Sequence, residues 1–158
     1  MRLAWRDGRE LAAWHFGRAD GFRSAEPRGT ASNTINPRKP GAAREVVKLW
    51  KRGRLQLVIS DDIVREYLLV LARFDLTDAQ MHSWATWFVH PAKTIHLVQP
   101  RRVAASRDPK DDMFLGAATT GKAQAIITRD DDLLVLNPFE GVAIETPAAF
   151  LEARQSKT

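Results

Sequence analysis

The sequence contains no cysteine, which excludes disulfides, thiolate metal sites and a cysteine nucleophile. This composition suits a reducing compartment, and we expect a cytoplasmic protein. No apolar run approaches the roughly 20 residues that a membrane-spanning helix needs. The opening stretch "MRLAWRDGRELAAWHF" carries charges inside its apolar part, unlike a signal peptide. We therefore expect no membrane association.

The 158 residues suffice for one domain, and 44% hydrophobic and 27% charged residues are ordinary for a globular protein. The net charge of +5 is unevenly distributed. Residues 1–54 carry 13 Lys and Arg against 5 Asp and Glu, whereas residues 55–158 carry 11 against 14. A basic front and an acidic remainder fit a protein that attracts a polyanion and holds metal near it. A solvated basic surface is the simpler alternative.

Short apolar runs alternate with helical patterns from residue 42 onward. We expect strands at 55–60, 94–100, 123–130 and 141–147, and helices between and after them. Residues 1–40 have no clear period, apart from a short helix expected around Arg9 to Phe16. Continuous apolar strands alternating with helices predict a parallel sheet covered on both faces, a three-layer α/β/α sandwich.

Acidic residues follow the expected strands. Asp61 and Asp62 follow 55–60, with Glu66 about one turn further along. Asp111 and Asp112 lie in the connection after the second strand, and Asp130 ends the third. Because parallel strands end at one edge of a sheet, we expect these acids at that edge.

Carboxylates gathered in this way favour Mg²⁺ or Mn²⁺, which prefer oxygen ligands. The four histidines are scattered, which argues against a zinc site. A carboxylate-held Mg²⁺ is suited to phosphodiester chemistry. Helix capping is the simpler explanation for each single aspartate. For Glu66, inside an apolar helix, the alternative is an ion pair with Arg65 or Arg73.

Two stretches resemble the PIN-domain proteins: "SDDIVREYLLVLARF" and "RDPKDDMFLGAATTGKAQAIITRDDDLLVLNPFEGVAIETPAAFL". The sequence is most similar to the stand-alone bacterial group described as toxin components of toxin–antitoxin systems. The likeness runs from about Asn36 to Leu151. It implies a three-layer α/β/α nuclease fold, an acidic cluster binding Mg²⁺ or Mn²⁺, and cleavage of single-stranded RNA. It also implies silencing by a cognate antitoxin, and a homodimer.

The resemblance assigns roles to individual acids. Glu66, Asp111 and Asp130 correspond to catalytic metal ligands of the family, with Asp112 and Asp132 as supporting metal ligands. Asp108 corresponds to a loop or cap residue and Asp131 to a surface residue. Five basic residues are expected to contact nucleic acid: Arg38, Lys39, Arg101, Arg102 and Arg129.

The N-terminal segment departs from the family pattern. Family members open with a buried strand ending in Asp-Thr-Asn, and this triplet is absent here, where "ASN" at 31–33 is the nearest echo. We therefore divide the chain into an atypical basic segment (1–35), a PIN-like domain (36–152) and a tail (153–158). Our hypothesis is that the first segment is coding sequence read in another frame, or follows from an upstream start. If the strand is missing, the sheet loses its central member and the metal site loses a ligand.

The sequence thus favours a metal-dependent ribonuclease, the toxin of a toxin–antitoxin pair, impaired if the first ligand is lost. A catalytically inactive module that binds RNA or an antitoxin is the alternative. A Mg²⁺-dependent phosphatase is weaker, since no Asp-x-Asp motif ends a first strand. Two further features have open readings. A basic stripe (Lys48, Lys51, Arg52, Arg54), together with the preceding "RKPGAAR", could bind a nucleic-acid backbone, although an exposed helix face is the simpler explanation. An aromatic group (Trp84, Trp87, Phe88) could stack bases or contact an antitoxin, although core packing is its more common role.

Overall fold

The computed structural model describes residues 10–14, 41–73 and 76–155. Its centre is a five-stranded parallel sheet with the strand order β3-β2-β1-β4-β5. The strands are β1 (Glu10–Trp14), β2 (Leu55–Ser60), β3 (Thr94–Leu97), β4 (Ala125–Ile127) and β5 (Ala143–Glu145). The expected parallel α/β architecture is therefore confirmed.

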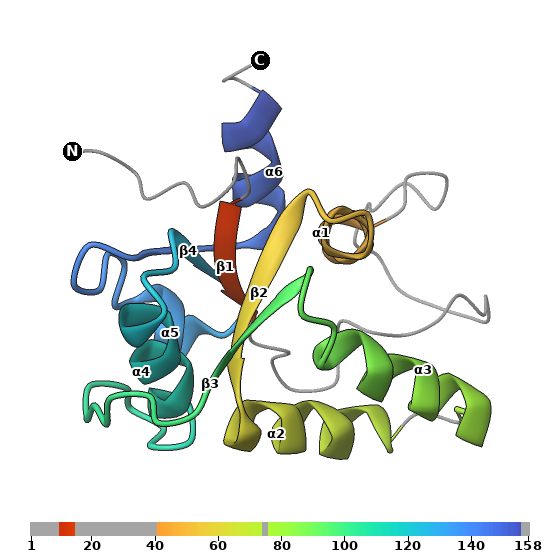
Figure 1. Ribbon diagram of the computed structural model, residues 1–158. Coiled ribbons are helices and arrows are strands. Elements are labelled where there is room, and N and C mark those ends of the chain that lie inside the picture. Colours follow the sequence, from red (N-terminus) through yellow and green to blue (C-terminus); the bar gives the residue numbers. More distant parts are fainter. Residues whose placement is uncertain (1–9, 15–40, 74–75, 156–158) are drawn as a thin grey trace, which may run out of the picture.

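Strand β1 occupies the middle of the sheet, between β2 and β4 (Figure 1). Its residue Ala12 is in register with Leu57 on one side and with Ala125 on the other. The prediction of a short helix over Arg9 to Phe16 is therefore wrong for Glu10–Trp14. The sheet does not lose its central member, because this segment supplies a central strand.

The helices agree with the predicted patterns to within a few residues. They are α1 (Ala42–Lys51), α2 (Asp61–Leu71), α3 (Asp78–Phe88), α4 (Asp112–Thr120), α5 (Asp131–Leu134) and α6 (Pro147–Gln155). Thr77 caps α3 through a capping box with Gln80. Gly121 ends α4, as predicted. Strands β3 and β4 are shorter than the apolar runs that suggested them.

The sheet is packed on both faces. Leu55, Leu57 and Ile59 of β2 join a core cluster with residues of α1, α2 and α3. The alternate residue Val58 joins a second cluster that contains Leu115 of α4. Figure 1 shows α4 and α5 on one side of the sheet, with α1 and α3 on the other. This is the three-layer arrangement that the alternating pattern predicts.

The parallel topology sets the positions of the acidic residues. Strand β2 leads into α2, β4 leads into α5, and β3 leads through residues 98–111 into α4. All these connections leave the carboxyl edge of the sheet, as expected. None of the helices in the described part of the chain has the length and apolar character that crossing a bilayer requires.

Candidate functional site

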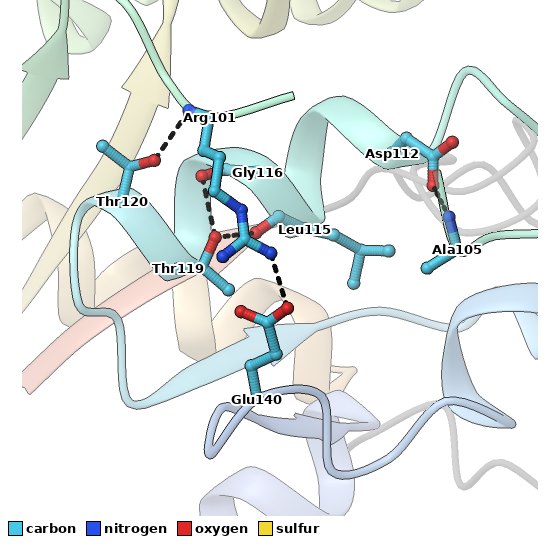
Figure 2. A network of polar contacts seen from close by, with 8 residues as sticks. All are labelled: Arg101, Ala105, Asp112, Leu115, Gly116, Thr119, Thr120 and Glu140. Carbon is cyan, nitrogen blue, oxygen red and sulfur yellow. Dashed lines mark hydrogen bonds and ion pairs between the residues drawn. The ribbon is translucent and has the colours of Figure 1, made fainter. Parts of the chain in front are cut away.

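The two aspartates at the start of α4 lie in different environments. Asp111, the N-cap residue, is only 5% exposed, and the hydroxyl of Ser106 lies 3.5 Å from its Oδ2 atom. The Oδ1 atom of Asp112 accepts hydrogen bonds from the backbone N–H groups of Ala105 and Ser106, at 3.0 and 2.8 Å. Figure 2 shows Asp112 directed at Ala105. Asp112 therefore fastens the connection after β3 to the start of α4.

The aspartates after β4 are also held by local contacts. Asp130 caps α5, because its Oδ1 atom accepts the N–H of Asp132 at 2.9 Å. The N–H of Asp130 in turn donates to the Oγ1 atom of Thr128 at 2.9 Å. The carboxylate of Asp132 lies 3.9 Å from Arg107. This exposed contact links the first turn of α5 to the connection that leads to Asp111.

Glu66 lies on α2 and is half-buried. Arg65, which the sequence offers as a partner, lies 3.5 Å from Asp62 instead. Within the described residues, the Glu66 carboxylate forms no hydrogen bond or ion pair. Its role as a metal ligand stays a prediction.

Two acids that we assigned to the surface or to a turn behave as expected. Asp131 is exposed. Asp108 forms a turn, in which its Oδ1 atom accepts the N–H of Lys110 at 3.0 Å.

The carboxylates of this edge suit Mg²⁺ or Mn²⁺. One nitrogen donor also lies among them, because the Nε2 atom of His96 in β3 lies 2.9 Å from Asp61. These side chains do not form a metal site in the structure. Among residues 10–14, 41–73 and 76–155, no three metal-binding side chains come close enough to share an ion. The described residues therefore do not fit a preformed metal site. The shared cation of Glu66, Asp111 and Asp130 stays a prediction, and β1 is followed in the sequence by His15 rather than by an acid.

The predicted nucleic-acid contacts differ in their availability. Arg38 and Lys39 lie outside the described residues. The guanidinium of Arg101 lies 2.5 Å from Glu140 and points towards it in Figure 2. This hydrogen bond and the charge of Glu140 raise the pKa of Arg101. Arg102 and Arg129 are exposed and form no ion pair within the described part of the chain.

The basic stripe lies at the other edge of the sheet, where α1 leads into β2. Lys48 is paired with Glu45 at 2.8 Å. The ammonium of Lys51 lies over the ring of Trp84, 4.4 Å from its centroid, and burial lowers the pKa of Lys51. Lys93, just before β3, lies 4.0 Å from the centroid of the Trp87 ring. Aromatic rings thus engage the charges of Lys51 and Lys93 at this edge.

Core packing also accounts for the aromatic group on α3. Phe88 is fully buried and Trp84 is 9% exposed. Both rings pack against Trp50 of α1, with centroids 5.6 and 6.3 Å away. Of the two readings of this group, the packing role is the one that the structure supports.

Two buried hydroxyls at the carboxyl edge were not anticipated. Ser60 ends β2 and is 3% exposed, and Thr128 follows β4 and is 1% exposed. The strand alternation contains the signal, because Ser60 and Thr128 stand two residues after the core residues Val58 and Ile126.

Comparison with known families gives one match. A family model described as PIN domain matches residues 31–132. The match covers the acidic segments and begins after β1, so the central strand is outside it. No curated protein matches the chain, and no solved structure does.

Proposed function

The chain belongs to the PIN-domain family, and from this premise we propose that it is a ribonuclease that cleaves single-stranded RNA. The proposal includes Mg²⁺ or Mn²⁺ as the cofactor, a cytoplasmic location and a role as the toxin of a toxin–antitoxin pair. The supporting observation is that three connections leave the same edge of the parallel sheet, and that each of them leads into a helix that begins with acidic residues. A cognate antitoxin and a homodimer belong to the same proposal and rest on the likeness to stand-alone PIN toxins.

Within this proposal, Glu66, Asp111 and Asp130 are the catalytic residues. The carboxylate of Glu66 has no hydrogen-bond or ion-pair partner in the described part of the chain. It is therefore available to bind a metal ion or to accept a proton. Asp111 and Asp130 stand at the starts of α4 and α5, after connections that leave the carboxyl edge of the sheet. Asp112 and Asp132 support them.

We expect the cleavage to be impaired. The described acids do not gather in a group of three, and the residue after β1 is His15 rather than the family's aspartate. These two observations also favour a second candidate function, a catalytically inactive module that binds RNA or an antitoxin.

Cleavage of labelled single-stranded RNA in the presence of Mn²⁺ separates these functions. The matched variant is Asp130→Asn, which keeps a side-chain oxygen to cap α5 but removes the charge. We expect this variant to fold normally and to cleave at least about tenfold more slowly, a barrier increase of about 1.4 kcal/mol. EDTA should abolish cleavage by the wild-type protein.

The controls decide between the two candidates. Equal cleavage by the wild-type protein and Asp130→Asn would indicate a contaminating nuclease and would contradict the ribonuclease assignment. RNA binding without any Mn²⁺-dependent cleavage would establish the inactive module instead.

A further inference from the structure

A groove lies beside the acidic edge, and its rim is the chain segment that follows β3. The groove has a volume of about 640 Å³, within the range of ligand-binding clefts. Residues 98–103 form one wall, and Asp62, Asp112 and Met113 complete the lining. It therefore lies between the starts of α2 and α4, next to the proposed catalytic acids.

The rim is fixed to α4 at two points. The N–H of Arg101 donates to the Oγ1 atom of Thr120 at 2.8 Å, near the end of the helix. The N–H groups of Ala105 and Ser106 donate to Asp112, at its start. A side chain at Gly116 would overlap the carbonyl oxygen of Arg101, so the segment lies directly on the helix. Figure 2 shows both attachments. The groove is thus preformed.

The two arginines of the rim are not equivalent. Arg101 is neutralised by Glu140, which lies away from the groove in a second hollow at the far end of α4. Arg102 is exposed and has no ion-pair partner in the described part of the chain. The groove also carries two carboxylates: Asp112, which accepts two backbone N–H groups, and Asp62, which lies 3.5 Å from Arg65. Arg102 is the cation of the groove that has no ion-pair partner among the described residues.

Apolar side chains line the groove beside this charge. Val98 is 85% exposed, and Pro100, Val103 and Met113 also line the groove. A free cation beside apolar surface matches the two parts of a nucleotide, an anionic phosphate and a flat base.

We propose that this groove is a subsite for single-stranded RNA, in which Arg102 binds a backbone phosphate and Val98 contacts the neighbouring base. The inference rests on the proposed RNA substrate, but not on its cleavage. It assigns the RNA path to the β3 side of the acidic edge, and it assigns the contact to Arg102 rather than to Arg101.

The test is the binding of a fluorescein-labelled single-stranded RNA of about ten nucleotides, measured by anisotropy in EDTA. The absence of metal keeps the result independent of cleavage. We expect Arg102→Ala to reduce the slope of log affinity against log salt by about 0.7 and to weaken binding about fivefold at about 0.1 M salt. Val98→Ala should weaken binding about threefold and leave the salt slope unchanged.

Arg73→Ala is the matched control, because Arg73 is exposed just after the end of α2 and belongs to no predicted nucleic-acid contact. It removes the same charge and should leave RNA affinity nearly unchanged. Wild-type affinity of Arg102→Ala, or an equal loss in Arg73→Ala, would overturn the inference. Failure of RNA cleavage alone, with these binding differences intact, would overturn only the ribonuclease proposal.

Discussion

Ser60 ends β2 and Thr128 follows β4, the two strands that flank β1. Their hydroxyl groups differ in hydrogen bonding. Each residue follows a core residue by two positions, so both face the layer of α4. Thr128 accepts the N–H of Asp130 at 2.9 Å. The hydroxyl of Ser60 is buried and finds no hydrogen-bond partner among the described residues, and it does not cap α2 although Ser60 is its N-cap residue. An unsatisfied buried hydroxyl costs about 1–3 kcal/mol.

Replacing Ser60 by alanine should therefore raise the stability of the protein. We expect a gain of up to about 1 kcal/mol, because the small void left by the oxygen offsets part of the relief. For a chain of this length the melting temperature should rise by about 2–4 °C, measured by differential scanning calorimetry without metal. Thr128→Val is the control, and it should be destabilised by about 1 kcal/mol because the Asp130 N–H loses its acceptor. A lower melting temperature for Ser60→Ala would show that the hydroxyl has a partner in solution.

At the scale of elements, the helices that were predicted correctly have sequence signals close to their own ends. The capping box of α3 and the glycine after α4 lie within a few residues of the helix ends that they define. Strand β1 lacks such a signal, because "ELAAW" contains no β-branched residue and alanine and leucine favour helices. Its extended state depends on pairing with β2 and β4, which are distant in the sequence. Tertiary context overrides local propensity at this element.

The close contact between α4 and the segment after β3 allows a prediction about how this segment is held on the helix. Gly116→Ala would place a methyl group against the Arg101 carbonyl, so the segment must move away from the helix. We expect a loss of about 1–3 kcal/mol from overpacking, together with weaker RNA binding, although Gly116 does not line the groove. Urea unfolding and the anisotropy measurement would check both effects. Unchanged RNA affinity in a destabilised variant would show that the groove does not depend on this attachment.

At the scale of the whole molecule, topology was easier to predict than side-chain geometry. The alternation of strands and helices places the acids at one edge of the sheet, and the structure agrees. Their separation depends on helix orientation and on hydrogen bonds such as those of Asp112, which no local pattern specifies. The absence of a three-residue metal group among the described side chains therefore could not be read from the sequence. The same holds for the neutralisation of Arg101 by the distant Glu140.

The central position of β1 leads to a prediction about the stability of the entire sheet. A strand flanked on both sides uses its backbone N–H groups in one ladder or the other, and proline has none to donate. Ala12→Pro should therefore separate the β3-β2 half from the β4-β5 half and destabilise the protein by more than about 3 kcal/mol. Ala79→Pro, in the exposed first turn of α3, is the control, because proline is tolerated there. Circular dichroism during thermal unfolding should show a large loss for the first variant and a small one for the second. Equal stability of the two variants would mean that Glu10–Trp14 does not join the sheet in solution, and that another segment fills the space between β2 and β4.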